Sequence, residues 1–281
     1  MSHPAAEIFH QAAAALADHP LRDGNVLHVP AEMRVVVGGD LHGHRQGLIA
    51  LLDAADLAGG DDRGLLVQEI VHAPPDPRSG QDRSIEVLLR AARALIDRPR
   101  QVLMLMGNHD VAEVTDSEIT KSGQKAVESF RQGVNYAYAE HGDGVLAAVH
   151  EMLRALPLAA RTPGGVFLSH SVPARRRMET AGIEVLDRPY TEEDFHRGGS
   201  VYEWTWGRGQ DQEQLAELAE RLDASFFVLG HRQTPSGWEP IGQLGVTLAS
   251  DHPRGAYLTL TGEKPLTAAS LGAHVHPLAG S

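Results

Sequence analysis

The chain repeats one pattern: a run of apolar residues, then a polar turn, then a segment with apolar residues at helical spacing. The first run is Val35-Val36-Val37, and further runs cover residues 65–71 and 102–106. Apolar runs of this kind are typical of strands that are buried on both faces. Leu48 and Leu52 follow the first run at helical spacing. Repeated units of strand, turn and helix predict an α/β fold, with a parallel sheet covered by helices on both faces.

Five apolar runs end in a histidine, an asparagine or a carboxylate. Ligands bind at the carboxyl ends of the strands in open α/β sheets. One polar residue at a strand end is ordinary, but five at one edge predict a metal site. Nitrogen and oxygen donors of this kind suit Mn²⁺, Fe or Zn²⁺. The strand-end residues are Asp40 and His42, Glu69 and His72, Asn108 and His109, His170, and His231.

Composition narrows the classes of function. The 281 residues carry a formal net charge of −12, which disfavours non-specific binding to nucleic acids. Cysteine is absent, so disulfides and thiolate ligands are excluded. The segment from Met1 to Leu16 has no basic region and no continuous apolar stretch, so we expect no signal peptide and no membrane partner. The cytoplasm is the expected location, and the oligomeric state stays open.

We expect one large domain with three additions. An N-terminal helix should lie within residues 1–25, and the main domain should cover residues 26–265. A helical insertion over residues 120–157 should cap or frame the site, because its apolar residues keep helical spacing. Residues 266–281 contain Gly, Ala and His and predict a flexible tail.

The order of these motifs resembles the calcineurin-like metallophosphoesterases, whose pattern is Asp-x-His, Gly-Asp, Gly-Asn-His, His and Gly-His. The resemblance extends from Arg34 to Leu260 and implies a four-layer α/β/β/α sandwich. Two further segments, Leu156-Pro157-Leu158-Ala159-Ala160 and Asp187-Arg188-Pro189, are similar to the phosphoprotein phosphatase branch. The matching motifs are Gly39-Asp40-Leu41-His42-Gly43, Gly107-Asn108-His109-Asp110, His170 and Gly230-His231.

The resemblance implies two divalent metal ions, with manganese as the first choice and iron or zinc as alternatives. Two ions about 3.5–4 Å apart can share a hydroxide that attacks phosphorus. The family pattern assigns the ligands as follows: Asp40 and His42 hold the first ion, Asn108, His170 and His231 hold the second, and Glu69 bridges them.

The same resemblance assigns the catalytic residues. His109 would protonate the leaving oxygen, since it stands beside a ligand and is not needed as one. Arg208 would clamp the phosphate, with a solvated arginine as the alternative. Asp110, which completes the third motif, is a further candidate.

The second motif departs from the family, because Gln68-Glu69 replaces Gly-Asp and His72 replaces an aspartate. Glu69 is one methylene longer, so we expect it to push the metals or the strand end apart. His72 cannot orient His109 as an anion would. Three roles stay open for His72: an additional metal ligand, an acid or base in its own right, or a hydrogen-bonded residue at the strand end. Gln233 stands where many members carry another histidine, although the phosphoprotein phosphatases generally do not.

The first functional hypothesis is hydrolysis of a phosphomonoester, either a phosphoprotein or a small phosphate ester. The second is hydrolysis of a phosphoanhydride, such as a dinucleoside polyphosphate. The third is a catalytically weak phosphate-binding scaffold, which the altered second motif would explain. Retention of every other ligand type weighs against the third hypothesis.

Overall fold

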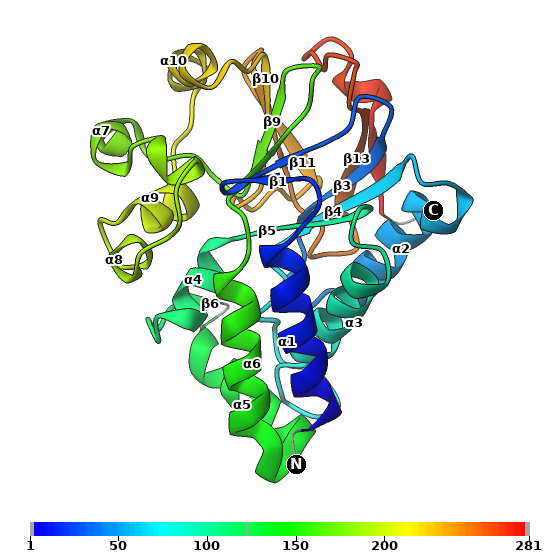
Figure 1. Cartoon of the computed structure of the whole chain (residues 1–281), viewed down its shortest axis with the longest axis vertical. Coiled ribbons are helices and arrows are strands. Elements are labelled where there is room, and N and C mark those ends of the chain that lie inside the picture. Colours follow the sequence, from blue (N-terminus) through cyan, green and yellow to red (C-terminus); the bar gives the residue numbers. More distant parts are fainter. Residues whose placement is uncertain (1–2, 122, 279–281) are drawn as a thin grey trace.

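A computed structural model describes residues 3–121 and 123–278 of the chain (Figure 1). Within these residues the main strands form a five-stranded sheet, in the order β14-β13-β3-β4-β5, and a seven-stranded sheet, in the order β1-β2-β8-β9-β10-β12-β11. The five-stranded sheet comprises β3 (Arg34–Asp40), β4 (Arg63–Gln68), β5 (Val102–Leu105), β13 (Ala256–Thr261) and β14 (Val275–Pro277). The seven-stranded sheet comprises β1 (Arg22–Asp23), β2 (Val26–His28), β8 (Ala159–Arg161), β9 (Val166–Ser169), β10 (Phe226–Leu229), β11 (Trp238–Ile241) and β12 (Gly245–Leu248).

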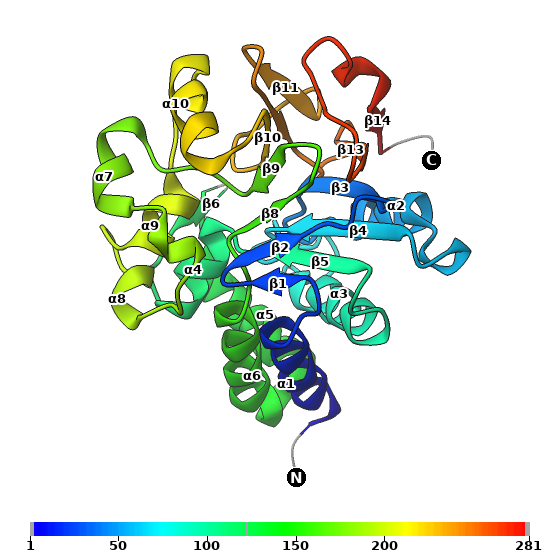
Figure 2. The ribbon, with the colours of Figure 1, turned by 45° about the horizontal axis from the view of Figure 1, so that its top comes forward.

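The two sheets pack face to face, with helices outside each of them (Figure 2). Helices α2 (Arg45–Ala55) and α3 (Ser84–Asp97) lie beside the five-stranded sheet, and α10 (Gln212–Leu222) lies beside the other. Side chains alternate between the two faces of each strand. Val35 and Val37 therefore pack in the core between the sheets, while Val36 packs in the core between its sheet and the helices. This arrangement confirms the four-layer α/β/β/α sandwich.

The apolar runs divide between the two sheets of the sandwich, whereas the pattern of strand, turn and helix, taken by itself, predicted a single parallel sheet. Strands β3, β4 and β5 run parallel in one sheet, and β9, β10 and β12 run parallel in the other. A strand buried on both faces has the same apolar run whether its second face meets a helix or another sheet. The apolar pattern therefore predicts where the strands lie in the sequence, but it cannot assign them to one sheet or the other.

Residues 120–157 form two helices that follow a short hairpin. The hairpin pairs β6 (Thr120–Lys121) with β7 (Gln124–Lys125). Helix α5 (Ala126–Tyr138) packs on α3 and α6 (Gly142–Arg154), and α6 also packs on α1 (Pro4–Ala17) and α4 (Asn108–Val114). The expected N-terminal segment 1–25 contains α1 but also β1, which already belongs to the seven-stranded sheet.

The prediction of a flexible tail over residues 266–281 is wrong for residues 266–278. Strand β14 pairs with β13, and Leu266 and Leu271 are buried in the core between the sheets. These two leucines supply the apolar contacts that the composition of the segment concealed. The last three residues, 279–281, lie outside the described part of the chain. Among the described helices, none has the length and hydrophobicity that crossing a membrane requires.

The remaining helices follow β9 and lead to the rim of the site. They are α7 (Met178–Ala181), α8 (Glu192–Phe195) and α9 (Ser200–Trp206). Arg188 donates to both carboxylate oxygens of Asp194, at 2.6 Å each, and Asp194 also accepts from the backbone N–H of Thr191. This ion pair holds the entry to α8 in place.

Candidate metal centre

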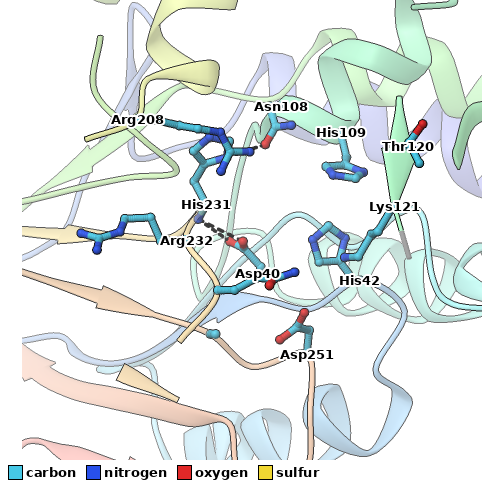
Figure 3. Close-up of a pocket in the computed structure, with 12 residues that line it drawn as sticks. Asp40, His42, Asn108, His109, Thr120, Lys121, Arg208, His231, Arg232 and Asp251 are labelled. Atoms are coloured by element: carbon cyan, nitrogen blue, oxygen red, sulfur yellow. Dashed lines mark hydrogen bonds between the residues drawn. The ribbon is translucent and has the colours of Figure 1, made fainter. Parts of the chain in front are cut away.

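The carboxyl ends of strands from both sheets meet at one place. Asp40 ends β3, and His231 follows β10 of the other sheet. The backbone N–H of His231 lies 3.0 Å from each carboxylate oxygen of Asp40 (Figure 3). His170 follows β9, next to β10, and its Nδ1 lies 3.4 Å from Asp40 Oδ1. The sandwich therefore gathers side chains that are far apart in the sequence.

Glu69 lies at the middle of this cluster. Its Oε1 accepts from the backbone N–H of His109 at 2.6 Å, and its Oε2 lies 2.5 Å from His170 Nε2. Two groups of possible ligand atoms form around it, one with His42 and His109 and the other with Asp40 and His170. Glu69 belongs to both groups, which is the placement that a bridging carboxylate needs. Asp40 and His42 fall in different groups, whereas the family pattern assigned both of them to the first ion.

Asn108, His170 and His231 bring three donor atoms together. Asn108 Oδ1 lies 2.9 Å from His170 Nε2 and 2.7 Å from His231 Nδ1. The two ring nitrogens lie 3.1 Å apart. His170 Nδ1 faces Gln68 Oε1 at 3.0 Å, so the replacement residue Gln68 orients the ring.

The residues present fit a pair of divalent cations. Within the described part of the chain, His231 Nε2 is buried without a hydrogen bond, and the buried Glu69 Oε2 has only the close approach of His170 Nε2. Buried polar atoms are normally paired, so an orphaned atom at this place indicates a missing ligand. His42 Nδ1 lies 3.1 Å from the carbonyl oxygen of Val71, which leaves Nε2 for an ion. All the donors are nitrogen or oxygen, which suit cations such as Mn²⁺, Fe and Zn²⁺.

Left-handed backbone places four of these side chains. The φ angles are 41° at His42, 49° at Glu69, 64° at His72 and 67° at His231. Such angles are uncommon outside glycine and cost about 1–2 kcal/mol each. The turn at Glu69 begins as soon as β4 ends at Gln68, so the longer side chain folds back into the site. Gly107 leaves the room for it, because a Cβ there would lie 2.3 Å from Glu69 Oε2.

The buried charged groups of the cluster shift one another's pKa values. Burial alone would lower the pKa of His170, but Glu69 and Asp40 outweigh burial and raise that pKa to about 10. Burial would raise the pKa of Glu69, yet His170 and His109 hold it well below its usual value. The cluster therefore keeps its carboxylates ionised, and a cation bound here would displace the proton of His170, because a ligating histidine must be neutral.

His109 lies beside this cluster and lines the cavity into which the candidate metal centre opens. Its ring contacts that of His42, with centroids 4.6 Å apart. Burial lowers the pKa of His109 well below its usual value, and His42 and His72 act in the same direction while Glu69 opposes them. A phosphate dianion in the cavity would oppose them too, because negative charge favours the imidazolium form.

The centre opens into a cavity of about 420 Å³. Arg208 and Arg232 line it on one side and Lys121 on the other, so cations face the metal ligands (Figure 3). Gln233 also lines it. Lys121 was not predictable from the sequence, because it lies in a two-residue strand without periodicity. Burial lowers the pKa of Lys121 to about 8, although Asp251 across the cavity opposes this shift.

Two further candidates, Asp110 and His72, are not among the described residues that line the cavity. Asp110 accepts from the backbone N–H of Gly107 at 2.7 Å and so caps α4. Burial raises the pKa of Asp110 well above its usual value, and Glu69 adds to the shift. His72 contacts His109, which lines the cavity, and is not itself among the lining residues.

The fold and the cluster of possible ligand atoms define a hydrolase of the two-sheet sandwich type. The family model of the calcineurin-like phosphoesterases matches residues 33–276, and the chain belongs to this family. No curated protein matches the chain in sequence.

Solved structures share the fold. A protein serine/threonine phosphatase from Saccharomyces cerevisiae, with similarity to the human phosphatase PP5, superposes with a TM-score of 0.69 at 14% identity, covering 92% of this chain and 82% of its own. A cold-active protein-tyrosine phosphatase from a psychrophilic Shewanella superposes with a TM-score of 0.59 at 15% identity, covering 90% of this chain and 82% of its own. At these identities the likeness supports the fold alone.

Proposed function

We propose that this protein is a dinuclear metal-dependent phosphomonoesterase. The observation that carries the proposal is Glu69, which belongs to two adjacent groups of ligand atoms below a cation-lined cavity. Asp40, His42, Asn108, His170 and His231 would complete the two sites, with manganese as the first choice of metal. When bound, the two cations would activate a water molecule and offset the charge of the phosphoryl oxygens.

The chain's own residues would bind and orient the ester. Arg208 and Arg232 face the cavity from the side of His231, and Lys121 faces it from the side of His42 (Figure 3). Charge-assisted hydrogen bonds from such groups hold a phosphate in a fixed orientation. His109 would give its proton to the leaving oxygen.

A neighbouring groove supports an ester with a large leaving group. It has a volume of about 840 Å³ and shares His42 and Asp251 with the metal-site cavity. It runs along the loop from Ala73 to Arg83 and reaches Tyr136, whose side chain is exposed. A phosphorylated polypeptide could lie along it, which favours a phosphoprotein over a small ester. The second candidate is a phosphoanhydride such as a dinucleoside polyphosphate, because the same groove has room for a nucleotide.

A substrate panel tests the proposal. The protein is loaded with Mn²⁺, Fe²⁺ or Zn²⁺, the bound metal is counted, and p-nitrophenyl phosphate, phosphoserine and phosphotyrosine peptides and a dinucleoside tetraphosphate are compared. We expect turnover of the phosphomonoesters with two ions bound, and loss of turnover in Asp40→Asn. Two bound ions with no turnover of any substrate would instead support a scaffold. Turnover confined to the tetraphosphate would favour the anhydride hydrolase.

A further inference from the structure

His72 occupies a buried place between His109 and a second acidic residue. Its Nδ1 lies 2.9 Å from His109 Nδ1, and its Nε2 lies 2.9 Å from Glu113 Oε2. The side chains of His72 and Glu113 have no exposed surface. The φ angle of 64° at His72 shows that the backbone is held in a strained conformation to keep the ring there.

The partners fix the direction of each hydrogen bond. A carboxylate can only accept, so His72 Nε2 carries the proton that is shared with Glu113. A neutral His72 then has a bare Nδ1, which accepts from the Nδ1–H of His109. His109 is thereby left with Nε2 as the nitrogen that serves the cavity, and in the imidazolium form of His109 this nitrogen carries the proton that can be transferred.

The helical insertion keeps Glu113 ionised. His150 on α6 donates from Nε2 to Glu113 Oε1 at 2.9 Å, and Arg131 on α5 lies 4.0 Å from the same oxygen. Burial would raise the pKa of Glu113, but His150 and His72 outweigh it and lower that pKa. Phe130, also on α5, packs against the His72 ring with centroids 5.7 Å apart.

We propose that Glu113 and His72 are positioning residues, which together fix the ring orientation of His109 and accept the hydrogen bond of its Nδ1–H, so that the imidazolium presents its Nε2–H to the cavity. They would supply through two side chains what one aspartate supplies in the usual second motif. The inference rests on the proposed function, because it assumes that His109 protonates a leaving group. It also gives the helical insertion a role, since α5 and α6 hold the acidic end of this chain of hydrogen bonds.

The test compares esters that differ in their need for a proton. Phenyl phosphate has a poor leaving group and 2,4-dinitrophenyl phosphate a good one. In His72→Phe, which keeps a ring but no hydrogen bond, we expect kcat to fall by about 10- to 100-fold on phenyl phosphate and by less than about threefold on the dinitrophenyl ester. Glu113→Gln should show the same dependence with a smaller loss. Bound metal should be unchanged in both variants.

Phe130→Leu is the matched control, because it loosens the packing of the His72 ring and keeps both hydrogen bonds. It should lower thermal stability and leave the ratio of the two rates unchanged. An equal loss on both esters in His72→Phe, or loss of a metal ion, would overturn the inference. Nitrogen-15 NMR of the histidine rings gives an independent reading, since a proton found on Nδ1 of neutral His72 would also overturn it. A wild-type protein inactive on both esters would contradict the proposed function instead.

Discussion

The backbone N–H of His231 donates to both carboxylate oxygens of Asp40, at 3.0 Å each. Asp40 ends a strand of one sheet and His231 follows a strand of the other, so this contact joins the two sheets at the metal centre. The carboxylate can keep this geometry only because residue 230 is glycine. A Cβ there would lie 2.3 Å from Asp40 Oδ1 and 2.9 Å from Gln68 Oε1.

Gly230→Ala should therefore weaken metal binding without unfolding the protein. The added methyl group displaces Asp40 and disturbs Gln68, which orients His170. We expect the affinity for metal to fall about 10- to 100-fold, as is usual when groups that support ligands move. Metal titration by calorimetry measures the effect. Gly144→Ala on α6 is the control, because a Cβ there meets open space. Unchanged affinity in Gly230→Ala would show that Asp40 is not a ligand.

His109→Ala should keep its metal content and lose turnover. Removing the proton donor costs about 10²–10⁴-fold in kcat, while the proposed ligands stay in place. Because His109 also belongs to a possible ligand group with His42 and Glu69, the metal content decides between its two roles. If one ion is lost together with activity, His109 is a ligand and another proton donor is needed.

Lys121 should make substrate binding depend on pH. Its pKa is lowered to about 8, first by burial, so it is charged below pH 8 and becomes neutral as the pH rises through that value. KM for an anionic ester should then rise between pH 7 and pH 9 by about tenfold, the worth of one charge-assisted hydrogen bond. Lys121→Arg should remove this rise, because an arginine stays charged throughout that range. A rise that persists in Lys121→Arg would assign the titration to another group.

The ion pair between Arg188 and Asp194 should contribute to stability above acidic pH. Arg188 lowers the pKa of Asp194, chiefly by hydrogen bonding, while burial opposes the shift. A carboxyl group whose pKa is lowered on folding stabilises the protein above its unfolded pKa, and this contribution is lost as the pH falls through the folded value. Asp194→Asn should reduce the free energy of unfolding by about 1 kcal/mol at pH 7, given that Arg188 is partly exposed.

Urea denaturation at several pH values measures this difference. The gap between Asp194→Asn and the wild type should shrink as the pH falls below 3.8, the ordinary pKa of aspartate, and close once the pH has passed below the lowered pKa of the folded protein. Asp143→Asn at the start of α6 provides a comparison from another helix, and its gap should stay small throughout. A gap for Asp194→Asn that is independent of pH would assign the effect to lost packing.

Residues that come directly after a buried apolar run were predictable from the sequence. Asp40, Asn108, His170 and His231 each stand at the end of such a run, and the fold fixes where those ends go. Lys121 could not be found in this way, because a two-residue hairpin strand carries no periodic pattern. Glu113 was equally hidden, since its partners, His72 in the loop after β4 and His150 on α6, meet α4 only in the folded protein.

The effect of the second motif was also not predictable. The sequence indicated that Glu69 would push the site apart, but the left-handed turn and Gly107 absorb the extra methylene. Backbone conformation of this kind depends on the surrounding structure and not on local preference, since glutamate rarely adopts it.

The left-handed conformations at His42, Glu69, His72 and His231 have a consequence for laboratory evolution. Glycine at any one of them would relieve about 1–2 kcal/mol of backbone strain, offset in part by the entropy that glycine loses on folding. It would also remove a histidine or glutamate from the centre. A library selected only for heat resistance should therefore enrich glycine at these four positions and discard activity, whereas a library selected for turnover should keep the strained residues and gain stability elsewhere.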